Sequence, residues 1–282
     1  MRSRAPALGG RASGNRAKRE RANVKRPVED FVSGLEAARH TAAVPGAERD
    51  AVFVLVHSPL VGPTAWSRVA RELKRRQRQA VVPSLLGLAG AEAPPWRHAP
   101  DAVRAATAST KGPIVLVGHS GAGVLLPIVA DTLTAEVAAL VFVDSFLPRT
   151  GGRLHLAPPG FMSQLRPLAT DGVLPPWSKW FGEETMRELV PDDRSRAALE
   201  AEMPRLPLSY FDAIVPLPAG WEAHPCAYLL LSDDPYGESA AEARDRGWAV
   251  VEIPGAGHLA MATEPEAVTD ALLDLEEALS SV

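Results

Sequence analysis

Apolar residues gather in short runs separated by polar segments from about residue 50 onward. Residues 51–56 form a continuous apolar run of strand length, and so do residues 138–143. Such runs are typical of strands that are covered on both faces of a parallel sheet. Helical spacing of apolar positions appears in residues 66–76, and a stronger apolar stripe follows in residues 264–279. The alternation predicts an α/β fold with a mostly parallel central sheet flanked by helices.

Other segments continue this rhythm along the chain. We expect strands at residues 80–82, 113–117, 227–231 and 248–253, and helices at residues 101–107, 124–133 and 238–246. In open α/β sheets the active site lies at the carboxyl ends of the strands. Polar residues that directly follow a predicted strand are therefore the candidates for chemistry.

The rhythm is lost between residues 148 and 221, where prolines and tryptophans are dense and the helical pieces are short. An interval of this length is too long for a structureless loop in a compact domain. We therefore expect a helical cap at residues 148–221, inserted into a core made of residues 50–147 and 222–282. Side chains of the insertion that are expected to line an apolar pocket are Met162, Trp177, Trp180, Phe181, Tyr210 and Phe211.

Composition narrows the class of protein. The chain has 282 residues, of which 46% are hydrophobic and 23% charged, as expected for one large globular core. The single cysteine, Cys226, excludes an internal disulfide framework, and no Cys/His cluster has the spacing of a zinc site. No metal or other cofactor is therefore expected. The apolar runs are far shorter than the roughly 20 residues needed to span a bilayer, so we expect a cytoplasmic protein without a membrane partner.

The first 45 residues differ in character from the rest. Between residues 1 and 26, nine arginines and lysines accompany a single acid. Such a segment has no apolar face to offset its ordering entropy, so we expect a basic, disordered tail. It lacks the apolar central region of a secretory signal, and no aromatic residues are interleaved with its charges. We therefore expect a small-molecule substrate and no nucleic-acid partner.

The strand predicted at residues 113–117 ends in a turn of small residues, Gly118-His119-Ser120-Gly121-Ala122-Gly123, which leads into an apolar helical run. A strand that reverses into a helix within a few residues forces the serine into a strained conformation, and only small neighbours let the turn close. The Ser120 hydroxyl is thereby placed over the sheet edge. The turn resembles the G-x-S-x-G nucleophile elbow of the α/β-hydrolase family, with Ala122 in place of the last glycine.

This resemblance implies a catalytic triad in the chain order serine, acid, histidine. His258 lies in a loop of small residues after the last strand, which resembles the family's histidine loop, and is the candidate general base. The acid stays open. Asp234 is favoured because it follows the strand where the family usually carries its acid, and Asp144, at a position used by some branches, and Asp233 are its rivals. Asp233 or Asp234 could instead cap the helix that follows.

The resemblance also implies an oxyanion hole formed by the Gly121 N–H and a second donor from the loop after the first core strand. In relatives whose loop begins His-Gly-x, the N–H of x is that donor. Alignment on His57 makes x Pro59, which has no N–H. The Leu60 N–H or the Ser58 hydroxyl is the expected substitute. Residues of this region expected to contact substrate are His57, Pro59 and His119.

These features predict a bacterial serine hydrolase that acts on a small apolar ester, thioester or lactone through Ser120, His258 and one aspartate. The missing donor leaves a lyase of the same fold as an alternative, because elimination can use Ser120 and His258 as a base without a full tetrahedral intermediate. Ser58 also occupies the position of a substrate-contacting hydroxyl in hydroxynitrile lyases, which this branch of the family resembles. A non-catalytic binding protein that kept the fold is the third reading.

Overall fold

The computed structural model describes residues 51–92, 94–149, 152–157 and 160–281. The predicted basic tail, residues 1–45, lies outside this part of the chain. The central sheet has six parallel strands in the order β2-β1-β3-β4-β7-β8. The strands are β1 (Val52–Val56), β2 (Ala80–Val81), β3 (Ile114–His119), β4 (Val137–Val143), β7 (Cys226–Leu230) and β8 (Ala249–Glu252). Each lies at a segment where the sequence predicted a strand, and the predicted α/β class is confirmed.

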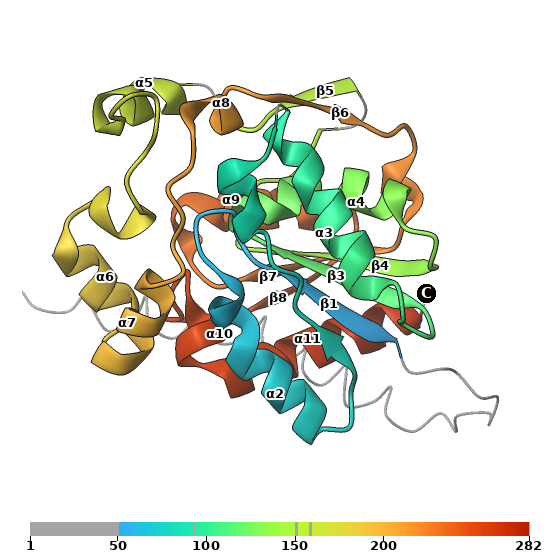
Figure 1. Ribbon diagram of the computed structural model, residues 1–282. Helices are drawn as coiled ribbons and strands as arrows, with labels where there is room; N and C mark the ends of the chain where they lie inside the picture. Colours follow the sequence, from blue (N-terminus) through green and yellow to red (C-terminus); the bar gives the residue numbers. More distant parts are fainter. Residues whose placement is uncertain (1–50, 93, 150–151, 158–159, 282) are drawn as a thin grey trace, which may run out of the picture. The chain divides into compact units, whose positions relative to one another are not determined.

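Helices cover both faces of this sheet (Figure 1). One face carries α2 (Ser67–Arg75), α10 (Ala260–Thr263) and α11 (Pro265–Ser280), and the other α3 (His98–Thr107), α4 (Leu126–Thr132) and α9 (Asp233–Asp245). Alternate strand residues point to opposite faces. In β1, Phe53 and Leu55 therefore pack against the α2 and α11 face, whereas Val54 and Val56 pack against the α3 face. The continuous apolar runs are explained by this burial on both faces.

The insertion contains helices, as predicted, and also a second sheet. Its helices are α5 (Phe161–Leu165), α6 (Glu183–Leu189), α7 (Asp193–Glu200) and α8 (Leu208–Phe211). The prediction of a purely helical insertion was incomplete, because β5 (Gly152–His155) and β6 (Ile214–Leu217) pair antiparallel at its two ends. The four residues of β5 are mostly exposed and show no apolar alternation, so no strand is predicted there from the sequence.

Strand order brings distant segments together at the carboxyl edge of the sheet. β3 and β4 are neighbours, and so are β4 and β7, with Val143 paired to Leu229. The residues that follow these three strands are therefore adjacent in space: Ser120, Asp144 and the loop that begins at Leu231. No helix in the described part of the chain is long and apolar enough to span a membrane.

Candidate active site

Ser120 lies at a sharp turn between β3 and the helical segment that follows. Its backbone has a φ of 53°, a left-handed conformation that non-glycine residues rarely adopt. The chain then continues through a 3-10 helix, Ser120–Leu125, into α4. A strained residue that is held in place by its surroundings is a common mark of a functional site. The turn therefore has the backbone conformation expected for an exposed serine nucleophile.

Small residues at this turn are required by close packing at Gly118 and Gly123. A Cβ atom on Gly123 would lie 2.1 Å from Ser145 Oγ, and one on Gly118 would lie 2.7 Å from a methyl group of Leu126. Ala122 is fully buried, so a methyl group is accommodated where the family's pattern has glycine. The steric requirement for glycine is thus met one residue later, at position 123.

Gly123→Ala is expected to destabilise the protein by about 1–3 kcal/mol, the usual range for forcing an extra methyl into a packed interior. Gly121→Ala is the matched control, because its Cβ would meet Pro59 at 3.5 Å, an ordinary contact. Urea denaturation of both variants measures the difference. Equal stability of the two variants would contradict the packing described for Gly123.

His258 is held by Asp144. Its Nδ1 lies 3.0 Å from Asp144 Oδ2, and the aspartate side chain is completely buried whereas that of the histidine is 15% exposed. An imidazole that donates Nδ1–H to a carboxylate has Nε2 free to accept a proton. The pair therefore has the arrangement of a base and the group that orients it.

Asp144 is itself fixed by the loop after β7. Its Oδ1 accepts hydrogen bonds from the N–H groups of Leu231 (2.6 Å) and Ser232 (3.1 Å), and its Oδ2 accepts one from the Ser232 hydroxyl. Every group bonded to this carboxylate can donate, so the side chain acts as an acceptor throughout. Its backbone φ of 42° is again in the left-handed region. Such restraint leaves the carboxylate one orientation, directed at His258.

The preference for Asp234 as the triad acid is not supported by these contacts. Asp234 lines the cavity above Ser120, but neither it nor Asp233 makes a hydrogen bond to His258 among the described residues. Asp233 begins α9, and its carboxylate lies against Gly237. The strand order explains the difference, because β4 and β7 are adjacent and Asp144, at the end of β4, meets the histidine loop directly.

Two other histidines that were expected to contact substrate, His57 and His119, are almost completely buried. His57 Nε2 accepts a hydrogen bond from Leu85 N–H (2.9 Å), and its Nδ1 donates to its neighbour Ser58 (2.8 Å). His119 Nε2 donates to the backbone carbonyl of His258 (2.9 Å), while its Nδ1 is buried without a partner. Burial lowers the pKa of His57, and burial and the neighbouring His258 lower the pKa of His119 well below 6.5. Both imidazoles are therefore neutral, and His119 supports the His258 loop.

Acidification is expected to destabilise the protein through His119. Below pH 6.5 the unfolded chain binds a proton that the folded protein does not take up at this site, so the unfolding free energy falls as the pH falls. Between about pH 7.5 and about pH 5.5 the loss reaches up to about 1.4 kcal/mol for one such site. Denaturant titrations should show a smaller loss for His119→Gln than for the wild type.

The loop after β1 packs against the turn at Gly121. Pro59 lies against Gly121, and the Leu60 N–H donates to Ser58 Oγ across 3.3 Å. Ser58, Leu60 and Gly121 line the cavity, as expected for residues near an oxyanion hole. Pro59 is buried and is not part of the cavity wall. The Leu60 N–H that was expected to replace the missing donor already has a local acceptor.

Tyr236 is a site residue that the sequence analysis missed. Its hydroxyl lies 3.5 Å from Ser120 Oγ, and its ring is parallel to the His258 imidazole, with centroids 5.1 Å apart and an interplanar angle of 9°. Tyr236 thus contacts both residues that the sequence proposed as nucleophile and base. The only sequence signal was its place shortly after Asp233 and Asp234, near the start of α9.

Ser120 and His258 open into a cavity of about 530 Å³, a size typical of small-molecule sites. Apart from Asp234, no described residue of its wall carries a formal charge. Of the pocket residues predicted from the sequence, His119, Trp177, Trp180, Phe181 and Phe211 line this cavity. The predictions for His57, Pro59, Met162 and Tyr210 are not supported, since none of these residues belongs to its wall. Tyr210 is instead buried in the core between the insertion and the sheet.

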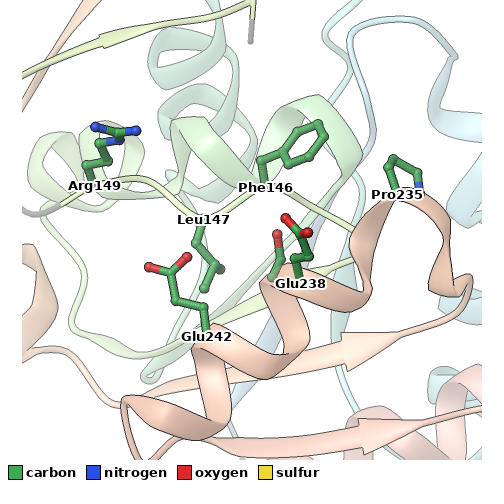
Figure 2. A pocket seen from close by; sticks show the side chains of 7 residues that line it. Phe146, Leu147, Arg149, Pro235, Glu238 and Glu242 are labelled. Atoms are coloured by element: carbon green, nitrogen blue, oxygen red, sulfur yellow. The ribbon is translucent and has the colours of Figure 1, made fainter. Parts of the chain in front are cut away.

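A second hollow of about 430 Å³ adjoins this cavity along α9. Figure 2 shows Glu238 and Glu242 on one side of α9, with Phe146 and Pro235 at one end of the hollow and Arg149 at the other. Phe146 and Pro235 line both spaces. Phe146 therefore separates a charged hollow from the apolar cavity at Ser120. In the described residues, no group of three or more histidine, cysteine or acidic side chains could hold a metal ion.

The chain resembles known hydrolases in sequence. The model of the alpha/beta hydrolase family matches residues 53–271. A probable esterase of Oryza sativa subsp. indica, PIR7A, is 26% identical over 262 residues, which cover 78% of this chain and 95% of that protein. A carbendazim hydrolyzing esterase of Nocardioides sp. (strain SG-4G) is 29% identical over 108 residues, or 36% of this chain. The matched region spans 45% of that esterase.

Solved structures share the fold. An extracellular alpha/beta-hydrolase from a Paenibacillus species superimposes with a TM-score of 0.62 at 19% identity, covering 80% of this chain and 98% of that one. A pyrethroid hydrolase from Sphingobium faniae JZ-2 gives a TM-score of 0.62 at 19% identity, with coverages of 82% and 99%. Polyneuridine aldehyde esterase gives 0.62 at 18% identity, with coverages of 81% and 100%. At these identities the similarity establishes a common architecture.

Proposed function

Because the chain belongs to the α/β-hydrolase family, we propose that it is a serine esterase that uses Ser120 as nucleophile, His258 as base and Asp144 as the orienting acid. One observation carries the proposal: the buried Asp144 carboxylate holds His258 Nδ1 at 3.0 Å, and this histidine shares a cavity with a strained, accessible Ser120. The esterases among its relatives support the same class of reaction.

The chemistry follows from the roles of these groups. A serine hydroxyl is a weak nucleophile at neutral pH and needs a base to take its proton. His258 Nε2 accepts that proton as Ser120 Oγ attacks the ester carbonyl, and Asp144 stabilises the imidazolium that forms. His258 then returns the proton to the leaving alcohol. Water repeats the sequence on the acyl-enzyme and releases the acid.

The cavity wall supports an uncharged, largely apolar substrate. Five aromatic side chains of the insertion contribute to it: Phe161, Trp177, Trp180, Phe181 and Phe211. A carboxylate or phosphate on the substrate would be buried there without a cationic partner, which is unfavourable. The negative charge of Asp234 adds to this discrimination. Neutral aryl or medium-chain alkyl esters are therefore the proposed substrate class.

Fluorophosphonate labelling tests the proposal directly, because these reagents react with an activated serine. The wild type is expected to become labelled on Ser120 and to hydrolyse p-nitrophenyl butyrate, and Ser120→Ala is expected to lose both properties. Pre-incubation with the ester should slow labelling of the wild type. Ester turnover that survives in Ser120→Ala would overturn the mechanism.

Elimination is the second candidate, and Pro59 is the observation that favours it. A lyase needs less oxyanion stabilisation, and the second backbone donor is missing here. The two reactions differ in covalent chemistry, since only the hydrolase forms an acyl-enzyme. Mass spectrometry of rapidly quenched reactions separates them: an acyl group on Ser120 during p-nitrophenyl butyrate turnover supports hydrolysis, and its absence, together with release of cyanide from a cyanohydrin, supports elimination.

A further inference from the structure

We propose that the Tyr236 hydroxyl donates the second hydrogen bond to the oxyanion that forms when Ser120 attacks an ester carbonyl. This inference rests on the proposed esterase function and assigns Tyr236 as a further catalytic residue. The carrying observation is the 3.5 Å distance between the Tyr236 hydroxyl and Ser120 Oγ. The hydroxyl replaces a donor that the loop after β1 does not supply.

The backbone offers no free N–H at position 59 or 60. Pro59, which lies against Gly121, has no N–H. The next N–H along the chain, that of Leu60, donates to Ser58 Oγ. Acyl transfer with one oxyanion donor instead of two is slower by about 10²–10³-fold. An efficient esterase with this loop therefore needs a donor from a side chain.

Tyr236 is held beside Ser120 by two ring contacts. One ring contact is the parallel stack on His258, and another is Phe146, with ring centroids 5.3 Å apart. These contacts on a largely buried side chain fix the direction of the hydroxyl. A separation of 3.5 Å is long for a direct bond between two hydroxyls, which is usually about 2.7–2.8 Å. It leaves room for a carbonyl oxygen of the substrate, which lies beside Oγ once the new bond has formed.

The protonation state of the Tyr236 hydroxyl also suits a hydrogen-bond donor. Burial raises the pKa of Tyr236 to about 12, so the phenol keeps its proton at neutral pH. In the proposed step, Ser120 Oγ forms a bond to the carbonyl carbon while its proton passes to His258 Nε2. The electron pair of the carbonyl double bond moves to oxygen, which then accepts hydrogen bonds from Gly121 N–H and Tyr236 O–H. Tyr236 retains its proton, and the pair returns when the alcohol leaves with the proton from His258.

Tyr236→Phe is the decisive variant, because phenylalanine keeps the ring stack on His258 and removes only the hydroxyl. With p-nitrophenyl butyrate we expect kcat to fall about 10²-fold, whereas KM stays within about threefold because the lost interaction exists only in the transition state. Affinity for a trifluoromethyl ketone, which forms a tetrahedral adduct on serine, should fall in proportion to kcat/KM. Tyr210→Phe, the same deletion in the buried core, should leave kcat unchanged. Thermal unfolding of each variant verifies folding.

Pro59→Ala provides a second test of the role of Tyr236, since alanine restores a backbone N–H beside Gly121. In the Tyr236→Phe background we expect this change to recover at least about tenfold of the lost kcat, because one oxyanion donor is worth about 10²-fold or more. A purely structural role of Tyr236 predicts no such rescue. Should Tyr236→Phe fail to fold, Pro59→Ala in the otherwise wild-type chain decides: a kcat within a few-fold of the wild-type value supports an oxyanion hole already completed by Tyr236, and a kcat raised about tenfold or more opposes the proposal, because it shows that the second donor was missing.

The outcomes separate this inference from the proposed function. A wild type that is neither labelled by fluorophosphonate nor active on esters contradicts the esterase itself. An active wild type whose kcat is unchanged in Tyr236→Phe contradicts only the role of Tyr236. A loss in Ser58→Ala, with none in Tyr236→Phe, would assign the second donor to Ser58.

Discussion

Asp144→Asn is expected to lower kcat by about 10⁴-fold, the effect of replacing a triad aspartate by its amide. The amide oxygen can still accept the Leu231 and Ser232 N–H groups, which places the amide nitrogen toward His258 Nδ1. That nitrogen is a donor, so Nδ1 must lose its proton and act as acceptor. The proton then resides on Nε2, which can no longer accept one from Ser120.

Asp234→Asn is the matched control for this variant, because Asp234 lines the cavity without contacting the imidazole. Its kcat should remain within a few-fold of the wild-type value, and removal of its charge is expected to act on KM instead. Steady-state kinetics on p-nitrophenyl butyrate and the rate of fluorophosphonate labelling measure both effects. A collapse of kcat in Asp234→Asn with a near-normal rate in Asp144→Asn would reverse the assignment of the acid.

The sheet and its flanking helices could be predicted from the sequence because helices cover both faces of the sheet, and this burial determines where apolar residues occur along the chain. Strands such as β1 and β4 are buried on both faces and therefore read as unbroken apolar runs. The terminal helix α11 packs one face on the sheet, and its apolar stripe repeats with helical spacing. These signals are local, so a single sequence carries them.

The sequence alone could not decide which aspartate is the triad acid, because the order of the strands in the sheet determines which aspartate reaches His258. Asp144 and His258 are 114 residues apart, and their contact depends on β4 lying next to β7 in the sheet. Chain order alone makes the loop after β7 an equally good source of the carboxylate. An aspartate that directly follows a strand buried over its last five residues was the one available signal for Asp144, since a charge at that position requires partners.

Tyr236 and the small sheet of the insertion were missed for different reasons. A tyrosine has no motif of its own, and its relevance arises from contacts with His258 and Ser120 that only the folded chain brings together. The strand β5 is exposed on one edge of a two-stranded sheet and includes Gly152 and two polar residues. Its pairing with β6 rather than its composition makes it a strand.

His258→Ala is expected to reduce kcat by about 10⁶-fold, since removal of a triad histidine alone abolishes nearly all of the triad's contribution. The variant leaves a space beside the rings of Tyr236, Trp177 and His119, whose centroids lie 5.1, 6.2 and 4.5 Å from that of His258. Added imidazole can occupy this space and accept the Ser120 proton, so part of kcat should return and saturate with imidazole concentration. In His258→Ala/Ser120→Ala the same addition should restore nothing. Rescue that is independent of Ser120, or absent from a folded His258→Ala protein, would contradict the assignment of His258 as the base.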